Sequence, residues 1–489
     1  MNLHLSRTIV TLGSIALSGV CFYLSLGLSG SYGYLFWIAP IPVLVLSVGG
    51  SGTKAFFIAF LAYLIGRLSW FSYLVRVVTL VPAIIFTLLL PLIFAFILIA
   101  TRKVVVKSGQ WYSVFAFPVF FTTFEFLVLE FSRDGSAGSI AYSQSNNLSL
   151  IQIASVTGIL GITFFITLIP SAAALAWHRR NRKNKSQAII RFAFIIIGLT
   201  LGFGFLRLTL NPPGKGGTVK VGLAALDEKS HYITNHPDIE KEKQSTEDYA
   251  MLISKLADSG AKLVVLPERA VNIDPQTEPV INDILSKIAR QKNVFIISGY
   301  TNFKTDVQRN SSLVLDNRGN LVVDYNKVYL VSGFEKQFTP GSNIGLFTMN
   351  AIKTGTAICK DLDFPSYIRH YGNAGIEFLN IPAWDFIKDD WLHSRMAVLR
   401  GVEDGFSEVR TARQGRLTIS DAYGRIIAEA NSSKGNAVIL SGNVPIQRLF
   451  TIYSRWGNWF GMANMIATIF FIFLIVKKKK HPDKTISAI

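Results

Sequence analysis

The chain has 489 residues, of which 50% are hydrophobic and only 16% are charged, and its mean hydropathy is +0.37. Lysine and arginine number 49 against 31 aspartates and glutamates, which gives a formal net charge of +18. This combination excludes a disordered polybasic tail and an ordinary soluble enzyme, because neither keeps so much apolar surface away from water. The composition therefore predicts a membrane protein.

Eight apolar runs resemble membrane-spanning helices, which need about 20 mostly apolar residues. Seven of them lie in the first 210 residues, and the second is shorter than the others. The first run is not expected to be a cleaved signal peptide, since it lacks a small-residue cleavage site and six more runs follow it. The predicted spans are 8–27, 34–48, 55–75, 77–100, 111–131, 156–177, 188–210 and 460–476.

The loops between these runs predict the orientation of the chain, because Lys and Arg near span ends stay on the cytoplasmic side. With the N-terminus inside, the basic clusters at 179–185 and 477–480 fall inside, whereas the outside loops hold only Arg76 and Arg133. These clusters are then expected to meet anionic lipid headgroups. No nucleic-acid partner is expected, since the polar part of the chain has no basic stripe interleaved with aromatic residues.

The sequence changes character at the turn-rich segment Asn211-Pro212-Pro213-Gly214. Beyond it, short apolar runs such as 263–267 and 294–300 alternate with helix-like polar segments, a pattern typical of an α/β domain. The predicted organisation is seven transmembrane helices in 1–210, an α/β domain outside the cytoplasm in 211–454, an eighth transmembrane helix in 455–480 and a cytoplasmic tail in 481–489.

Three residues near the ends of predicted strands could carry chemistry, namely Glu268, Lys327 and Cys359. Each also has an ordinary explanation: a solvated strand end for Glu268, a surface residue for Lys327 and a small buried hydrophobe for Cys359. As a set they supply a base for a thiol proton, a nucleophile and a cation beside the oxyanion that forms with a thioester. The set therefore predicts cysteine-based acyl chemistry. The second cysteine, Cys21, lies in an apolar run and is predicted to be a packing residue.

The three residues and their context resemble the carbon–nitrogen hydrolase (nitrilase) superfamily, in the segments LPE ending at Glu268, NK ending at Lys327 and ICKDLDFP around Cys359. Seven spans, such an insert and one final span are similar to the apolipoprotein N-acyltransferase family over nearly the whole chain. The resemblance implies a polytopic α-helical membrane domain of eight helices plus a nitrilase-like αββα sandwich. It also implies a bacterial cytoplasmic (inner) membrane, with the catalytic domain on the extracytoplasmic, periplasmic side.

The same resemblance assigns roles to individual residues. Glu268 would be the general base, Cys359 the nucleophile and Lys327 the oxyanion stabiliser. Glu335 would be a second carboxylate near the site, and the backbone N–H of Lys360 would complete the oxyanion hole. The family moves an acyl chain from a phospholipid onto the cysteine, and then to the α-amine of a lipoprotein's N-terminal diacylglyceryl-cysteine. The implied partners are those two substrates and the bilayer, and the implied state is a monomer.

Further candidates come from the resemblance and from charges inside spans. Arg67 in the third span is predicted either to extend its side chain to the membrane interface or to contact a donor phosphate. Glu125 in the fifth span is predicted either to have a functional role or to hold two helices together. Asp361 is the remaining candidate beside the nucleophile. The other substrate-binding candidates are Trp384, His393 and Glu403.

No metal or cofactor is predicted, because His393 has no second ligand at a suitable spacing. Two alternatives to the N-acyltransferase remain open. The first is a membrane-tethered nitrilase-type amidase or hydrolase, or an acyltransferase with a different acceptor. The second is a receptor or scaffold whose nitrilase-like domain has no activity.

Overall fold

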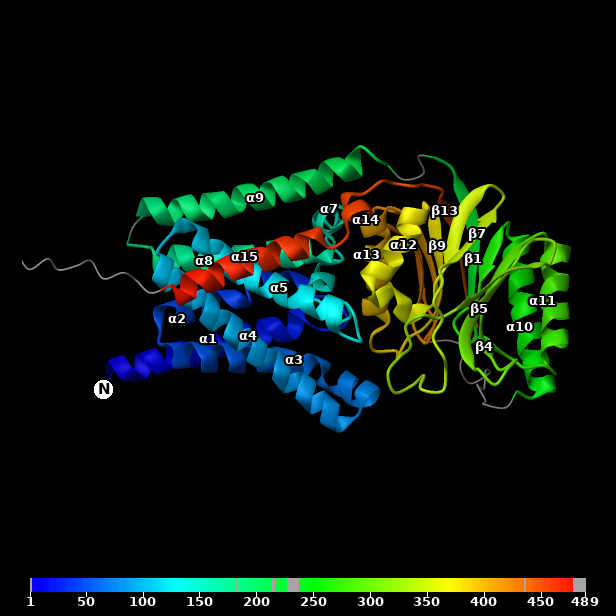
Figure 1. Cartoon of the computed structure of the whole chain (residues 1–489), viewed down its shortest axis with the longest axis horizontal. Helices are drawn as coiled ribbons and strands as arrows, with labels where there is room; N and C mark the ends of the chain where they lie inside the picture. Colours follow the sequence, from blue (N-terminus) through cyan, green and yellow to red (C-terminus); the bar gives the residue numbers. More distant parts are fainter. Residues whose placement is uncertain (1, 182, 213–215, 227–236, 435–436, 478–489) are drawn as a thin grey trace, which may run out of the picture.

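A computed structural model of the chain describes residues 2–181, 183–212, 216–226, 237–434 and 437–477. Long helices gather in a bundle at one end of the molecule, and two β-sheets flanked by helices form the other end (Figure 1). The predicted tail 481–489, the basic residues Lys478 to Lys480, and Pro213 and Gly214 of the predicted hinge lie outside the described residues.

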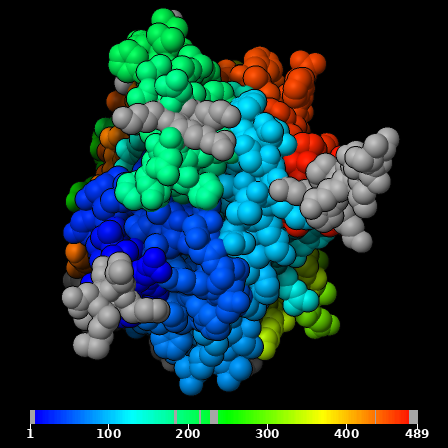
Figure 2. All heavy atoms as spheres, turned by 90° about the vertical axis from the view of Figure 1, so that its left-hand side faces the viewer, coloured from blue at the N-terminus to red at the C-terminus, as the bar shows by residue number. Residues whose placement is uncertain are grey.

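Within the described residues, seven helices are long and apolar enough to cross a membrane. Six precede the sheets and one follows them, in agreement with seven of the eight predicted runs. Figure 2 views the bundle from the end away from the sheets and shows the first helices, in blue, packed beside later ones in light blue and green. The seven helices are α1 (Asn2–Ser25), α3 (Gly52–Val78), α4 (Leu80–Ser108), α5 (Ala116–Phe131), α8 (Ile159–His178), α9 (Lys183–Thr209) and α15 (Trp459–Val476).

The predicted second span, 34–48, folds differently from the others. It forms a 3-10 helix, η1 (Gly33–Trp37), and a ten-residue helix, α2 (Pro40–Gly49), with a proline at the start of α2. Ten helical residues reach only about 15 Å, half the thickness of the hydrocarbon core. Pro40 and Pro42 lack a backbone N–H, so they fit the first turn of a helix but not the interior of a longer one. A count of eight full spans is therefore not observed.

The bundle has an aromatic core and an apolar exterior. Phe22, Tyr63 and Phe94 lie in its centre, with ring centroids 4.4–5.6 Å from one another, and the Phe22 ring lies 5.8 Å from that of Phe36. On the outside, Leu199 and Ile466 leave 70% and 67% of their surface exposed. Such an exterior is stable in a lipid environment but not in water.

Short helices connect the spans on the side that faces the sheets. α6 and α7 precede α8, and Gly158 interrupts the helical path between α7 and α8 with a φ of +66°, a conformation that favours glycine. A side chain there would also collide with the Tyr453 ring, 2.6 Å from the Cβ position. These connecting elements are η3 (Ile140–Gln144), α6 (Leu148–Ile151), α7 (Ala154–Thr157) and α14 (Ile452–Trp456). A further short helix, η2 (Trp111–Phe115), joins α4 to α5 at the other end of the bundle, near the ends of α8 and α15.

The second part of the molecule is a four-layer α/β sandwich. One sheet has the strand order β13-β1-β2-β4-β5-β6, with β3 beside β4, and the other has the order β12-β11-β10-β9-β8-β7. Helices α10 (Ile239–Asp258) and α11 (Glu278–Lys292) cover the outer sheet, and α12 (Pro365–Ala374) and α13 (Asp390–Asp404) lie between the inner sheet and the bundle (Figure 1). The predicted nitrilase-like α/β domain is thus confirmed as an α/β fold.

The strands of the two sheets are short, and the central ones are buried on both faces, as expected for sheets covered on both sides. Fully buried runs occur in β2, β9 and β10. The strands are β1 (Thr218–Ala225), β2 (Leu263–Val265), β3 (Val271–Ile273), β4 (Phe295–Asn302), β5 (Arg309–Leu315), β6 (Leu321–Asn326), β7 (Gly345–Met349), β8 (Ile352–Thr356), β9 (Phe378–Trp384), β10 (Ser407–Arg413), β11 (Arg416–Ser420), β12 (Ile426–Asn431) and β13 (Val438–Pro445).

Parallel strands bring several chain segments to one edge of the sandwich. β1, β2 and β4 run parallel in one sheet, and β8, β9 and β10 in the other. β5 is antiparallel to both β4 and β6, so β6 ends, and β5 begins, at the edge where β4 ends. The carboxyl ends of parallel strands are where open α/β folds place their sites.

Helix α13 joins the two parts of the molecule through a shared core. Its residues Trp391, Met396 and Leu399 belong to the same hydrophobic cluster as Phe22 and Phe36 of the membrane helices. Thirteen of its fifteen residues are buried. A continuous core of this kind fixes the sandwich to the bundle instead of leaving it on a flexible tether.

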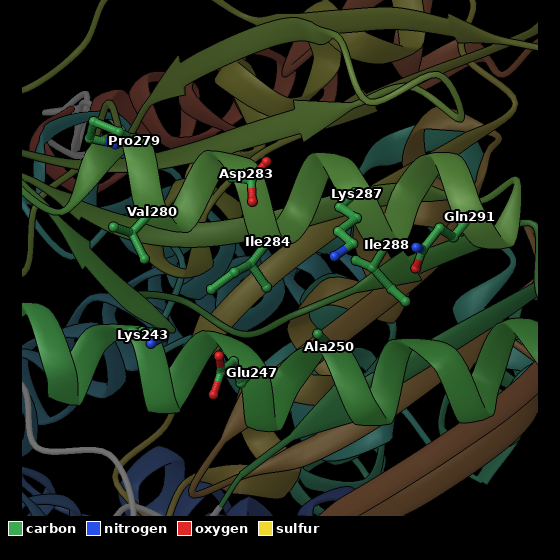
Figure 3. Close-up of a pocket in the computed structure, with 10 residues that line it drawn as sticks. All are labelled: Lys243, Glu247, Ala250, Pro279, Val280, Asp283, Ile284, Lys287, Ile288 and Gln291. Carbon is green, nitrogen blue, oxygen red and sulfur yellow. The ribbon is translucent and has the colours of Figure 1, made fainter.

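The opposite, outer face of the sandwich carries a shallow groove. Figure 3 shows side chains from α10 and α11 facing each other across it, among them Glu247, Ile284 and Lys287. None of the residues that the sequence nominated for chemistry lines this groove. The candidate catalytic residues lie instead at the ends of strands.

Candidate active site

Cys359 begins the turn that follows β8. It opens a 3-10 helix, η5 (Cys359–Asp363), and has a φ of +43°, a left-handed conformation that a non-glycine residue rarely adopts. Its Sγ lies 3.5 Å from the main-chain carbonyl oxygen of Trp384, to which the thiol can donate. The turn therefore holds the thiol at the sandwich edge in a strained backbone, as is common at functional sites.

Lys327 and two carboxylates form a buried cluster at the same edge. The Lys327 Nζ lies 2.7 Å from Glu268 Oε1 and 2.9 Å from Glu335 Oε2. All three side chains are at least 95% buried, so the ordinary readings of Glu268 as a solvated strand end and Lys327 as a surface residue are wrong. A buried cation is stable only when opposite charges and hydrogen bonds surround it, and here two carboxylates provide them.

Asn310 connects the two carboxylates and was not predicted. Its Nδ2 donates to Glu268 Oε1 at 2.6 Å and to Glu335 Oε1 at 2.5 Å. Glu335 also accepts from the backbone N–H of Val331 at 2.6 Å, which fixes the second oxygen. The sequence signal for Asn310 is a polar residue at the start of a buried strand, β5. In the structure this strand runs antiparallel to β6, which ends just before Lys327.

Burial and neighbouring charges set the protonation states of the cluster. Burial opposes the charge on Lys327, but Glu268 and Glu335 outweigh it and raise the lysine pKa well above its ordinary value. Burial likewise opposes ionisation of Glu335, yet Lys327 and the hydrogen bonds lower its pKa overall. Burial, and then Glu268, raise the pKa of the Cys359 thiol well above its ordinary value. The resting thiol is therefore neutral and needs a base before it can attack.

The loops around the cysteine share an unusual backbone. Arg269, Cys359, Ile387 and Gln414, which follow β2, β8, β9 and β10, all have φ between +43° and +67°. Next to them, a Cβ at Gly299 would lie 2.7 Å from the Glu268 Cα, so only glycine lets this turn pack against β4. The clustering of strained positions at one edge marks it as the functional edge.

Asp361 holds the turn that carries Cys359 through four hydrogen bonds. Its carboxylate accepts from the Tyr325 hydroxyl at 2.6 Å and from the backbone N–H groups of Ile358, Val328 and Tyr329 at 2.8–3.1 Å. Burial raises the pKa of Asp361 to about 6 despite these hydrogen bonds. The residue thus ties the cysteine turn to the loop after Lys327 instead of facing a substrate.

The Lys360 side chain points away from the cluster and towards the helical bundle. Its Nζ lies 2.8 Å from Asp134 Oδ1, in the loop after α5, and 3.5 Å from Asp363 Oδ2. In the same place, the backbone N–H of Ser136 donates to the Asp363 carbonyl at 2.8 Å. Two contacts therefore connect the nucleophile turn directly to the membrane part.

His393 belongs to a second charged cluster, at the junction with α3. Its Nδ1 lies 3.4 Å from Asp385 Oδ1 and 3.3 Å from Asp389 Oδ2. Burial opposes its charge, but the two aspartates raise the His393 pKa to about 9. Asp389 accepts from the Tyr73 hydroxyl of α3 at 2.8 Å, and Asp385 forms a bidentate ion pair with Arg410 at 2.5 and 3.0 Å. We call Asp385, Asp389, His393, Arg410 and Tyr73 the junction cluster.

Two other candidates, Glu403 and Glu125, lie elsewhere in the fold. Glu403 pairs with Arg400 at 3.0 Å and accepts from the N–H of Ile159 at 2.8 Å, at the start of α8. Glu125 accepts from Ser139 at 2.9 Å and from the N–H of Ile140 at 2.7 Å. It also accepts a short hydrogen bond from Thr163, which favours the helix-pairing alternative.

Arg67 and Cys21 are packed inside the bundle. The guanidinium of Arg67 lies 4.8 Å from the centre of the Trp70 ring, and its side chain is buried instead of reaching an interface. Cys21 is buried in the core of the bundle. Neither residue is brought to the catalytic edge by a contact in the described structure. Among the described residues, no group of three or more His, Cys, Asp or Glu side chains could hold a metal ion.

Comparison with known proteins matches both parts of the chain. Residues 229–447 match the family described as carbon–nitrogen hydrolase, and residues 18–172 match the apolipoprotein N-acyltransferase N-terminal domain. The chain is 26% identical to the apolipoprotein N-acyltransferase of Geobacter metallireducens, over 91% of this chain and 92% of the relative.

Other relatives cover different shares of the chain. It is 26% identical to the apolipoprotein N-acyltransferase of Thermotoga maritima, over 96% of this chain and 94% of the relative. It is 25% identical to the 2-oxoglutaramate amidase of Bacillus subtilis, over 40% of this chain and 78% of the relative. The two matching regions and the full-length relatives agree, and the chain belongs to the apolipoprotein N-acyltransferase family of the carbon–nitrogen hydrolases.

Proposed function

We propose that the chain transfers a fatty acyl group from a phospholipid to the α-amine of a lipoprotein's diacylglyceryl-cysteine, through a thioester on Cys359. The observation that carries this proposal is the buried Glu268–Lys327–Glu335 cluster beside Cys359, at the edge of a sandwich that shares its core with membrane helices. The names of the full-length relatives support the same reaction. A site fixed close to the bilayer meets two lipid-anchored substrates at high local concentration.

In the first half-reaction, Glu268 takes the thiol proton and the sulfur attacks the ester carbonyl of the phospholipid. The Lys327 ammonium and the backbone N–H of Lys360 stabilise the oxyanion. The C–O bond to glycerol then breaks, and the leaving oxygen takes the proton back from Glu268. A lysophospholipid departs, and the acyl group remains on Cys359 as a thioester.

In the second half-reaction, a neutral α-amine attacks the thioester carbonyl. Its proton passes through Glu268 to the departing sulfur, so that an amide forms, the C–S bond breaks and the thiol is restored. Glu335 and Asn310 keep Glu268 and Lys327 in place, since each contacts at least one of them within 2.9 Å. We regard both as positioning residues.

We further propose a topology in which the catalytic edge lies outside the cytoplasm of a bacterial inner membrane. The start of α1 and the end of α15 lie at the end of the bundle away from the sandwich (Figure 1). In this proposal the shorter apolar segment Gly33–Gly49, made of η1 and α2 together, returns the chain to the cytoplasmic side, so that the basic loops stay inside. The division into 1–210, 211–454, 455–480 and 481–489 and the monomeric state belong to this proposal.

The second candidate function is hydrolysis, which the similarity to 2-oxoglutaramate amidase favours. Water would then replace the amine in the second half-reaction, with the same three residues. The two candidates differ only in what attacks the thioester, so the acceptor decides between them.

The test uses the full chain in detergent micelles with phospholipid and a synthetic diacylglyceryl-cysteine peptide. We expect N-acylated peptide by mass spectrometry, and little free fatty acid when the peptide is present. An N-acetylated peptide is the matched control, because its nitrogen cannot attack. Free fatty acid as the main product with the free-amine peptide would contradict the transferase and support the hydrolase.

A further inference from the structure

Arg413 is a buried cation at the end of β10. Its side chain is 0% exposed, and its Nε and Nη2 have no hydrogen-bond partner among the described residues. Its Nη1 donates to the main-chain oxygen of Arg269 at 3.2 Å, and it forms no ion pair with a described carboxylate. Glu242 is within electrostatic range, but both of its oxygens accept from Asn272 instead. A buried guanidinium in this state is costly unless an anion joins it.

Arg410, three residues earlier on the same strand, provides the comparison. It is equally buried, but Asp385 binds it with two hydrogen bonds of 2.5 and 3.0 Å. Side chains alternate along a strand, so residues 410 and 413 point to opposite faces of the inner sheet. Arg410 therefore faces α13 and the bundle and is paired with Asp385, whereas Arg413 faces the space between the sheets and forms no ion pair with a described carboxylate.

A second arginine and a tryptophan complete the surroundings of Arg413. Arg413 pairs with Trp384 in the parallel register of β9 and β10, and its guanidinium carbon lies 5.0 Å from the Trp384 ring centre. The Arg269 guanidinium carbon lies 5.6 Å from the same ring and 5.0 Å from the Phe338 ring. Burial lowers the pKa of the Arg269 guanidinium and Arg413 adds to this effect, although Glu268 and Glu335 oppose it. A further anion between or beside the two guanidinium groups would therefore stabilise both.

This cationic pair is adjacent to the reacting groups. Arg269 directly follows Glu268 in the chain, and the carbonyl of Trp384 lies 3.5 Å from the Cys359 sulfur. A ligand whose anionic group meets the arginines can therefore place a neighbouring carbonyl at the thiol. A glycerophospholipid has this arrangement, since only the glycerol backbone separates its phosphodiester from its acyl ester.

We propose that Arg413 and Arg269, stacked on Trp384, bind the phosphodiester of the acyl donor. Guanidinium groups bind phosphate oxygens through paired hydrogen bonds, and two of them can bridge one phosphodiester. The proposal rests on the proposed function, in which a phospholipid is the donor. It also gives the donor a direction: the phosphodiester lies at the Arg269–Arg413 pair, and the acyl ester lies at Cys359.

The test compares two donors with the same acyl chains, phosphatidylglycerol and diacylglycerol, which lacks the phosphodiester. The full chain in detergent micelles is mixed with each donor, and the rate at which its intact mass gains an acyl group is measured. We expect Arg413→Gln and Arg269→Gln to slow loading from phosphatidylglycerol by about 10- to 100-fold, the range for a lost charged hydrogen bond. Loading from diacylglycerol should change less than about twofold.

Arg318→Gln is the matched control, since Arg318 is exposed in the turn between β5 and β6. Added inorganic phosphate tests whether a free phosphate also occupies the arginine pair. If it does, phosphate should slow loading of the wild type from phosphatidylglycerol, and it should not slow loading of Arg413→Gln. Equal loading of Arg413→Gln and wild type from phosphatidylglycerol would overturn the proposal. If Arg413→Gln does not fold, Arg269→Gln carries the same test.

Failure of the proposed function would look different. The wild-type chain would then gain no acyl group from either donor. In that case, calorimetric titration of inorganic phosphate into wild type and Arg413→Gln still decides the anion site, with heat of binding expected only for the wild type. Absence of binding to the wild type would overturn it.

Discussion

Two charged clusters lie near Cys359 at the sandwich edge, since groups of both are within electrostatic range of its thiol. They differ in which parts of the molecule they connect. The catalytic cluster of Glu268, Lys327, Glu335 and Asn310 is made entirely by the sandwich and is closed to solvent. The junction cluster draws Tyr73 from membrane helix α3. Chemistry thus depends on one part of the molecule, whereas the placement of that chemistry above the bilayer depends on both. Changes in the first cluster should lower turnover, and changes in the second should mainly loosen the docking of the sandwich on the bundle.

The largest effect is expected from the nucleophile and its base. Cys359→Ala should lower acyl transfer by at least about 1,000-fold, because a lost nucleophile cannot be replaced. Glu268→Gln should lower it by roughly 100- to 10,000-fold, the usual contribution of a general base. Product formation from phospholipid and peptide, with thermal melting to check folding, measures both. Full activity of Cys359→Ala would place the nucleophile elsewhere.

The junction cluster should make stability fall in alkaline solution. The His393 pKa of about 9 lies above its value of about 6.5 in an unfolded chain, so its stabilising contribution is complete below about pH 6.5 and is lost as pH rises through about 9. The loss can reach about 3 kcal/mol. Melting temperature against pH should therefore fall more steeply for wild type than for His393→Gln. Parallel curves for the two proteins would contradict the charged state of His393.

Asn310→Ala should act on chemistry without detaching the sandwich. Loss of its two hydrogen bonds frees Glu268 and Glu335 to move, and we expect turnover to fall by roughly 10- to 100-fold, as for a lost hydrogen bond to a charged group. The pH profile of turnover should also shift, because the hydrogen bond from Asn310 helps to lower the pKa of Glu335. Asn317→Ala in the turn after β5 is the control. An unchanged profile with lower stability would mean that Asn310 is only structural.

Tyr73→Phe should have the smallest effect. It removes the hydroxyl that donates to Asp389 at 2.8 Å and leaves the ring, so we expect a stability loss of about 1–2 kcal/mol. Turnover should fall less than about tenfold, since the catalytic cluster is untouched. Tyr34→Phe, whose ring is 63% exposed, is the control. A turnover loss as large as that of Glu268→Gln would erase the distinction between the two clusters.

The sequence was sufficient where a residue's position follows from a simple pattern. Glu268, Lys327 and Cys359 each come shortly after a strand, and strands that point the same way bring their ends together. Seven apolar runs became long helices for the same reason, since length and composition alone decide that outcome. The run at 34–48 did not, because its two prolines count as apolar but shorten the helix.

Other features depend on pairings that a single sequence does not reveal. Asn310 reaches both carboxylates only because β5 runs antiparallel between β4 and β6. Arg413 meets Trp384 only through the register of β9 with β10, and nothing in the local sequence distinguishes it from Arg410. His393 showed no partner at ligand spacing, yet Asp385 and Asp389 reach it from the loop before its own helix.

The most direct test of the account is the intact mass of the purified chain after brief mixing with phospholipid and no acceptor. The account predicts one added acyl group on the wild type, mapped by peptide analysis to Cys359 and released by hydroxylamine as a thioester would be. Cys359→Ala should gain no mass under the same conditions. An unmodified wild type, or an acyl group that persists in Cys359→Ala, would contradict the central claim.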